Sequence, residues 1–390
     1  MAVTPFDFLR LDDLLNDEQR HLRQLVRRYV SDRVLPHINP YWERAEFPRD
    51  IAFGLRELPI MGTMLRGYGC AGLDPLAAGL VRYELGRGDG SIGTFYGVHS
   101  GLAMGSIGML GSEAQKARWL PDMADLRKIG AFGLTEPARG SDAANVLTTA
   151  RRDGDSYILN GQKRWIGNAA IADYLIIWAK DEAGQMGGFV IEEPGANPGV
   201  RISNIGGKIG KRAVLNADIE LTEARIPAAN RLAGARSFRD VARVLSYTRY
   251  TICWEAAGIA AACLEYALAY AREREQFGRP IAGFQLVQQK LVDMAADVTQ
   301  MQLFCFRLAQ LMAAGQATNG MVSLGKYNNA GKARRVASLA REILGGNGIL
   351  IENHIARLML DAEAIYTYEG TNEINLLIVG REMTGISAFV

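Results

Sequence analysis

The sequence predicts an α+β protein of three parts: an N-terminal α-helical domain over residues 1–128, a central antiparallel β-barrel or sandwich over 129–235, and a C-terminal domain like a four-helix bundle over 236–390. Chain length is one reason, because 390 residues exceed the usual limit for one hydrophobic core. The other is a change of apolar spacing, from helical to strand-like near Phe132 and back near Phe238.

In the N-terminal part, apolar residues repeat at helical spacing over 17–30, and Asn16 is placed to cap that helix. Further helices are expected over 75–86 and 112–119. The segment Gly67–Gly72 matches the G-x-G-x-x-G pattern of dinucleotide-binding folds. However, no strand is predicted before it and no helix opens within it, so we interpret it as a glycine-rich loop.

The central part is predicted to form short strands. Asn160 and Gly161 lie between two strand-like runs, a pattern typical of a hairpin turn whose residues both need positive φ. Buried strands are expected over 173–179 and 188–191. No helix of useful length separates the strands, which favours antiparallel pairing over a parallel nucleotide-binding sheet.

The C-terminal part is helical again, and its long amphipathic segments predict an antiparallel bundle over 241–274, 284–315 and 322–344. Gly278 with Pro280 breaks the first connection. The glycines of residues 345–348 end the third helix.

Composition excludes several functional classes. A net charge of +2 gives no electrostatic basis for binding nucleic acid. Four cysteines without CxxC spacing and four histidines without ligand spacing predict neither a disulfide framework nor a metal site. Without a targeting sequence or an apolar run long enough for a membrane span, the expectation is a cytoplasmic protein with no membrane insertion.

Glu369 is the candidate catalytic residue. It follows Tyr366 and Tyr368 and directly precedes Gly370, and such an apolar setting raises a carboxyl pKa towards that of a useful general base. Gly370 lets a flat ligand approach the backbone, and Thr371 is placed to cap a following helix. The alternative is an ordinary loop glutamate beside two core tyrosines.

Five segments in this order and spacing resemble the acyl-CoA dehydrogenase family over essentially the whole chain. The segments are Phe132–Asp142, Arg164–Asn168, Arg274–Gly278, Leu344–Gly348 and Tyr368–Thr371.

The resemblance implies FAD as cofactor, a homotetramer, and oxidation of an acyl-CoA thioester to the 2,3-enoyl-CoA. Glu369 matches the family's base for the α-proton, while the β-hydrogen leaves as hydride to the flavin. Since the α-carbon of a thioester is a very weak acid, its oxygen needs hydrogen-bond donors, which in this family include the backbone N–H of the same glutamate.

The resemblance also implies binding residues, listed by role. Flavin-binding residues of the β domain are Phe132, Leu134, Thr135, Gly140, Ser141, Trp165, Ile166 and Gly167; the alternative is that they are turn and core residues. Residues matching those that reach FAD in a neighbouring subunit are Arg274, Phe277 and Gln285, completed by Glu342, Gly346, Thr371 and Phe389. Substrate residues are Gly93, Thr94, Ser141, Tyr247, Arg249, Tyr368 and Gly370.

For two of these residues a plainer interpretation stays open. Arg274 suits a pyrophosphate by its charge, or is simply a cation favoured at a helix end. Arg249 resembles a substrate-site residue, but a purely structural ion pair would also account for an arginine at this position.

The branch of the family is a separate question. Residues 367–389 resemble glutaryl-CoA dehydrogenase, but that enzyme's carboxylate-binding arginine is replaced by Gly93, so a short, uncharged acyl chain is expected. Gly167 replaces a hydroxyl residue common near the flavin, and 162–168 resembles the plant short-chain acyl-CoA oxidase. The electron acceptor is therefore an electron-transfer flavoprotein or O₂. A catalytically silent acyl-CoA-binding scaffold is the remaining alternative, against which the presence of Glu369 argues.

Overall fold

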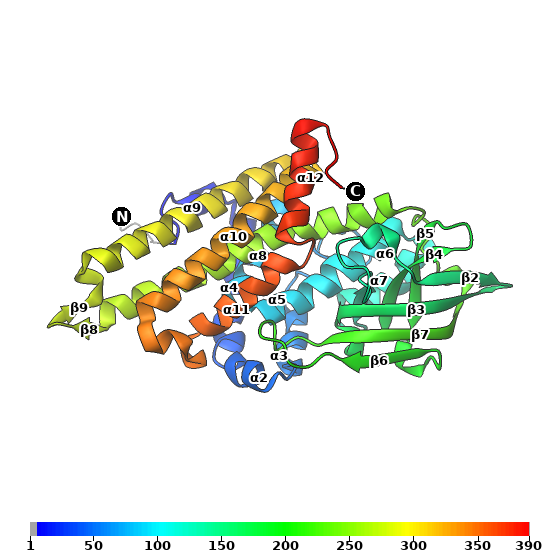
Figure 1. The fold of residues 1–390 in the computed structure, drawn as a ribbon, viewed down its shortest axis with the longest axis horizontal. Helices are drawn as coiled ribbons and strands as arrows, with labels where there is room; N and C mark the ends of the chain where they lie inside the picture. The colour runs from blue at the N-terminus through cyan, green and yellow to red at the C-terminus, as the bar shows by residue number, and fades with distance from the viewer. Residues whose placement is uncertain (1–5, 390) are drawn as a thin grey trace.

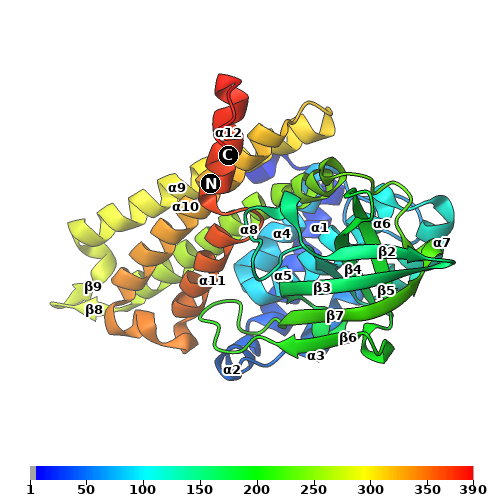
Figure 2. The same ribbon diagram turned by 45° about the vertical axis from the view of Figure 1, so that its right-hand side comes forward.

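The computed structural model describes residues 6–389 (Figure 1). The three regions follow in the predicted order, with the C-terminal helices on one side and the β-sheet on the other. Figure 2 shows N-terminal helices between the sheet and the bundle, so that α4 and α5 lie behind the junction of the two. The junction is where the chain segments carrying the candidate residues meet.

The N-terminal region is helical, as predicted. Capping boxes at Asn16 and Ser112 begin its first and last α-helices. Gly67–Gly72 is a loop in which Gly67, Gly69 and Gly72 have positive φ, so its interpretation as a glycine-rich loop is confirmed. The helices are α1 (Asp17–Tyr29), α2 (Ile38–Arg44), α3 (Arg49–Gly54), α4 (Pro75–Gly88), α5 (Gly90–Tyr96), α6 (Met104–Leu110) and α7 (Glu113–Ala124).

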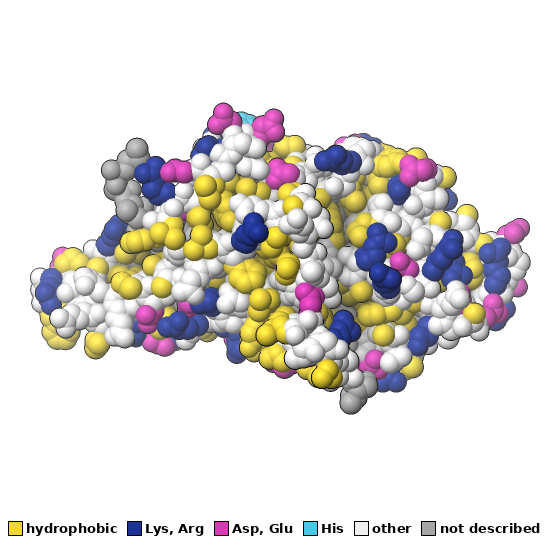
Figure 3. All heavy atoms as spheres, turned by 90° about the horizontal axis from the view of Figure 1, so that it is seen from above, with side chains coloured by type: hydrophobic (Ala, Val, Ile, Leu, Met, Phe, Trp, Pro, Cys, Tyr) yellow, Lys and Arg dark blue, Asp and Glu magenta, His cyan; other side chains and the backbone are white. Residues whose placement is uncertain are grey.

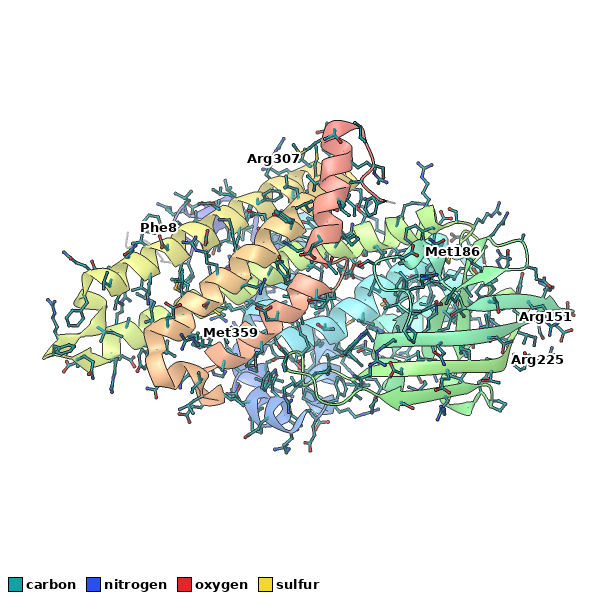
Figure 4. All side chains as sticks on the ribbon, viewed as in Figure 1. Phe8, Arg151, Met186, Arg225, Arg307 and Met359 are labelled. Carbon is teal, nitrogen blue, oxygen red and sulfur yellow. The ribbon has the colours of Figure 1, made fainter. Side chains whose placement is uncertain are left out.

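The central region is one seven-stranded sheet. Its order is β1-β4-β2-β3-β7-β6, with β5 paired to β4. Arg151 of β2 and Arg225 of β7 lie at its outer end, away from the helices (Figure 4). The strands are β1 (Gly130–Gly133), β2 (Thr149–Asp153), β3 (Ser156–Gly167), β4 (Tyr174–Asp181), β5 (Met186–Glu192), β6 (Val200–Asn204) and β7 (Asn216–Pro227).

The prediction of wholly antiparallel pairing is wrong for two strand pairs. β4 runs parallel to β1 along Gly130–Gly133 and parallel to β2 at Thr149 and Ala150. The connection from β1 to β4 is long enough to cross over because it contains the β2–β3 hairpin itself. A crossover helix is therefore not the only device that makes two strands parallel.

The predicted hairpin turn at Asn160-Gly161 is also wrong. The turn is at Gly154-Asp155, and β3 continues through Gly161 with a register shift against β7. A Cβ at Gly161 would lie 2.6 Å from Thr148 Oγ1, and Asn160 Oδ1 accepts from Glu223 N at 2.8 Å. The Asn-Gly pair serves a bulge, which needs the same permissive residues as a turn.

The C-terminal region is the predicted bundle, followed by two shorter helices. The hairpin of β8 (Glu275–Gln276) and β9 (Arg279–Pro280) forms its far tip, where Gly278 and Pro280 interrupt the helices as predicted (Figure 1). The helices are α8 (Phe238–Glu273), α9 (Gln285–Ala313), α10 (Asn319–Leu344), α11 (Ile355–Thr367) and α12 (Asn372–Thr384).

Helix α8 is the central element of the bundle. It is long and apolar enough to cross a membrane, but 78% of its most apolar 18-residue window is buried inside the fold. Its apolar residues, including Ala256, Ala257 and Ala260, belong to the core shared with α9, α10 and α11. Packing against these neighbours accounts for its composition.

Candidate functional site

Glu369 lies in the short connection between α11 and α12. Its φ of 55° is in the left-handed region, which a glutamate seldom occupies, and Gly370 follows with φ 81°. Thr371 then caps α12, its Oγ1 accepting from Ile374 N at 3.2 Å, as predicted. Two successive left-handed residues turn the chain sharply between the helices and fix the direction of the Glu369 side chain.

Buried cations hold the carbonyl groups of this connection. Lys326 Nζ of α10 donates to Tyr366 O at 3.0 Å and to Gly370 O at 2.8 Å. Arg249 Nε of α8 donates to Glu369 O at 3.0 Å. Among the described residues, none accepts a hydrogen bond from the Glu369 backbone N–H, which leaves that donor for a ligand.

The Glu369 carboxylate is held on one side only. Its Oε1 accepts from Thr248 Oγ1 at 3.1 Å, whereas Oε2 is buried without a partner in the described part of the chain. Burial raises the pKa of Glu369 above its ordinary 4.5, although Arg249, the Thr248 hydrogen bond and Lys326 oppose the rise. A buried carboxylate with a raised pKa and a free oxygen is suited to accept a proton.

Glu255 lies on α8 seven residues beyond Thr248, hence two turns and about 10 Å along the same face. It is fully buried and binds two cations at once. Arg82 Nη2 of α4 pairs with Oε2, and Lys211 Nζ, from the loop between β6 and β7, lies 2.6 Å from Oε1. Although burial by itself raises the pKa of Glu255, these two cations lower it overall.

Glycines bring α4 and α8 close enough for this ion pairing. A Cβ at Gly86 would lie 2.7 Å from Glu255 O, and one at Gly258 would collide with Tyr83 O. The two backbones are thus in direct contact, and the Arg82 and Glu255 side chains meet beside that contact.

Unpaired polar atoms gather near Glu255. Arg82 Nε, Thr94 Oγ1 and Tyr368 Oη are buried without hydrogen-bond partners among residues 6–389. Lys211 Nζ lies 5.6 Å from the centre of the Tyr368 ring. Burial, with the Glu255 carboxylate nearby, raises the pKa of the Tyr368 phenol. The region beyond Glu369 is therefore polar, with several donors.

A π-helical segment, Gly97–Ala103, joins this region to the β domain. A Cβ at Gly167 would lie 3.0 Å from Val98 of this segment, and one at Gly101 would lie 3.1 Å from Thr248 Cγ2. Gly167 and the Thr248–Glu369 pair therefore contact the same segment, at residues three positions apart. The predicted flavin face and the predicted base are neighbours.

The predicted flavin residues of the β domain differ in exposure. Phe132, Leu134 and Ile166 are buried in the core, so only their backbone groups are left for a cofactor. Trp165 is 51% exposed, and the position of a Cβ at Gly140 is open. The side chains of Thr135 and Ser141 form no hydrogen bond within the described chain. An exposed indole beside uncommitted hydroxyls fits a flat cofactor with polar edges.

The second predicted FAD half-site lies elsewhere. Arg274, Phe277 and Gln285 lie at the tip of the bundle, far from the sheet, and Phe277 is 94% exposed (Figure 1). Glu342, paired with Lys290 at 2.8 Å, and Gly346 lie near the same end. Thr371 and Phe389 are not brought to this group: Thr371 caps α12 beside Glu369, and Phe389 lies 5.7 Å from the Arg381 guanidinium.

The predicted substrate residues come from several elements, and among them Arg249 contacts Glu369 while Tyr368 and Gly370 flank it. Gly93 and Thr94 come from α5, beside Glu255 and Tyr368. Tyr247 accepts from Met64 N at 3.1 Å through its hydroxyl. Arg249 holds the carbonyl of Glu369, which gives this arginine a role beyond a simple ion pair. Ser141 is on the β domain, in the exposed loop after β1.

Sequence reasoning missed residues that contact or neighbour the predicted ones. These are Arg82, Lys211, Thr248, Glu255 and Lys326. One signal was present: Glu255 is a lone charge in the apolar run Cys253–Cys263, and a buried charge needs a partner.

Comparison with known proteins agrees with this geometry. Family models of the acyl-CoA dehydrogenase N-terminal, middle and C-terminal domains match residues 16–127, 131–224 and 238–384. A probable acyl-CoA dehydrogenase of Bacillus subtilis (strain 168) is 34% identical over 374 residues, 95% of this chain and 98% of the relative.

Two solved structures are also similar over 100% of both chains. Glutaryl-CoA dehydrogenase from Mycobacterium smegmatis has a TM-score of 0.96 at 42% identity. A glutaryl-CoA dehydrogenase from the same organism, in complex with FADH2, has a TM-score of 0.97 at 36% identity.

Proposed function

The chain belongs to the acyl-CoA dehydrogenase family of FAD-dependent oxidoreductases, and from this premise we propose that it oxidises a short, uncharged acyl-CoA to the trans-2-enoyl-CoA. The observation that carries the proposal is Glu369, a buried carboxylate with one oxygen free and a free backbone N–H beside it. The free carboxylate oxygen can take a proton, and the backbone N–H can donate a hydrogen bond to the thioester oxygen.

In the proposed reaction the α C–H bond breaks and its proton goes to Glu369 Oε2. The Glu369 N–H donates to the thioester oxygen as negative charge develops there. A bound FAD would supply the acceptor for the β-hydrogen and its electron pair, so that loss of both hydrogens leaves a double bond between the α- and β-carbons. Arg249 and Lys326, by holding the carbonyls of the connection, keep the carboxylate and the N–H on the substrate side.

Charge pairing supports an uncharged acyl chain. The two buried cations that contact Glu255, Arg82 and Lys211, are already neutralised by it, so neither is free to pair with a distal carboxylate of the substrate. The position of that cluster supports a short chain, because it lies about two helical turns beyond Thr248.

We also propose that the protein forms the homotetramer that the family resemblance implies. Residues 274–285 form the far tip of the bundle, whereas the flavin residues of the β domain lie near the junction of sheet and bundle, so a cofactor touching both groups needs a second copy. Hydrophobic side chains gather on the face seen in Figure 3, which includes the bundle, and Leu286, Val292 and Leu303 of α9 are exposed. Such surfaces favour association. Light scattering of the FAD-loaded protein tests the assembly.

Two electron acceptors follow from the sequence, an electron-transfer flavoprotein and O₂, and O₂ is kept as the second candidate because Gly167 replaces the hydroxyl residue common near the flavin. Stopped-flow reoxidation of substrate-reduced enzyme, with air or with an electron-transfer flavoprotein, separates the two. Peroxide formation at turnover rates identifies an oxidase.

The substrate is tested with straight and branched C4 to C8 thioesters while flavin absorbance is followed. Under the proposal butyryl-CoA bleaches the flavin. Failure of every uncharged thioester to do so in FAD-loaded protein would overturn it.

A further inference from the structure

The Glu255 carboxylate is enclosed by groups from four elements. Arg82 of α4 and Lys211 of the β6–β7 loop bind its two oxygens, and Tyr368 and Gly93 lie against it. A Cβ at Gly93 would lie 3.1 Å from Glu255 Oε1 and 3.9 Å from Arg82 Nη1. The carboxylate and the guanidinium therefore fill the space facing the glycine of α5.

The charges of this cluster balance without a ligand. Arg82 and Lys211 are opposed by Glu255, and by Asp361, whose Oδ1 accepts from the Lys211 backbone N–H at 2.5 Å. Next to it Arg357 and Asp89 form their own buried pair at 2.6 Å. Deletion of the Glu255 carboxylate would leave Arg82 and Lys211 without their common counter-ion in a water-poor interior, a costly arrangement that an external anion would relieve.

We infer that Glu255 is the specificity-determining residue of the acyl site, because its side chain occupies the place that the terminal carboxylate of a dicarboxylic acyl thioester would take. This role rests on the proposed function: the Glu255 carboxylate is the group by which the protein rejects acyl chains with a distal negative charge. Once Glu255 is removed, such chains should be accepted.

The test compares pentanoyl-CoA with glutaryl-CoA, which have acyl chains of five carbons and differ in the terminal methyl and carboxylate. Dissociation constants are measured by titration in an E369Q background, where proton removal does not obscure binding, and flavin reduction is followed separately. The native sequence at 255 is expected to prefer pentanoyl-CoA at least tenfold. Glu255→Ala is expected to shift the ratio of the two constants towards glutaryl-CoA by at least tenfold.

Two further variants assign the effect. Glu265→Gln removes another ion pair between α8 and α4, that of Glu265 with Arg87, and should leave the preference unchanged. Adding Arg82→Met to Glu255→Ala should abolish the gain. If Glu255→Ala does not fold, Glu255→Gln with Lys211→Met removes one charge of each sign, leaves Arg82 free, and should gain glutaryl-CoA binding.

The outcomes are distinguishable. An unchanged ratio in folded, FAD-loaded Glu255 variants, or equal binding of both thioesters by the native cluster, would overturn the inference while leaving the proposed function intact. Absence of flavin reduction by any uncharged thioester would instead count against the proposed function.

Discussion

Thr248 Oγ1 donates a 3.1 Å hydrogen bond to Glu369 Oε1, joining the middle of α8 to the connection between α11 and α12. The same hydroxyl also lies 3.2 Å from Leu245 O, so its single proton has competing acceptors. This bond to the ionised form is one of the forces that oppose the rise in the Glu369 pKa caused by burial.

Thr248→Ala should therefore raise the Glu369 pKa further and leave less ionised base at acid pH. Since the rate of flavin reduction by butyryl-CoA rises with pH through this pKa, we expect a loss of about fivefold at pH values well below it, the equivalent of ~1 kcal/mol. The difference should vanish at high pH. Thr248→Ser keeps the hydroxyl and should match the unchanged protein. Coincident pH profiles for all three proteins would show that the Thr248 hydroxyl does not lower the Glu369 pKa.

Lys326→Met should destabilise the connection that carries Glu369. Two carbonyls lose a charged donor, and the free energy of unfolding in urea should fall by about 2–4 kcal/mol. Lys332→Met is the control on the same helix, because its buried partner Asp297 keeps Arg335 as a second cation at 2.8 Å, so a loss of only about 1 kcal/mol is expected. Equal losses for both lysines would refute the anchoring role.

Gly258→Ala should separate α4 from α8, since a Cβ there meets Tyr83 O. We expect a loss of about 1–3 kcal/mol in the free energy of unfolding. Gly331→Ala on α10 has no atom within 4 Å of its Cβ and should be neutral or stabilising by about 0.5–1 kcal/mol. Thermal unfolding of both variants measures these changes. An unchanged free energy of unfolding in Gly258→Ala would show that α4 and α8 can move apart without loss.

The buried side chain of His99 should make the protein less stable in acid. Its Nε2 donates to Met123 O at 2.9 Å, its Nδ1 accepts from Gly130 N at 3.0 Å, and burial lowers its pKa to about 4 from 6.5. The unfolded chain thus binds a proton between pH 6.5 and 4 that the folded chain does not. The free energy of unfolding should fall by about 3 kcal/mol over this window as pH drops. His99→Gln should lower stability yet flatten that dependence, and an unchanged slope would assign the loss to other groups.

Much of the fold could be predicted because its signals are local. Asn16 and Thr371 cap helices in the positions that their neighbours in sequence indicate. The Asn160-Gly161 pair led to a wrong prediction of a hairpin turn, because a β-bulge and a tight turn require the same backbone freedom. Parallel pairing of β1 with β4 depends on a contact across more than forty residues, which local patterns do not encode.

For the candidate site, the sequence indicated Glu369 but not its surroundings. Arg82 and Glu255 are 173 positions apart, and their meeting depends on how closely α4 packs against α8. The expectation from Gly93 alone, that no cation faces the acyl site, omitted Arg82 and Lys211, whose charges Glu255 compensates. The physical reason for proposing an uncharged substrate is that Glu255 already pairs with both of these cations.

Glu369→Gln tests the central claim most directly, since glutamine keeps the size and the acceptor for Thr248 but cannot take a proton. We expect the variant to bind FAD normally and to be bleached by butyryl-CoA about 10²- to 10⁴-fold more slowly than the unchanged protein. Bleaching at an unchanged rate would contradict the account and assign proton removal to another residue.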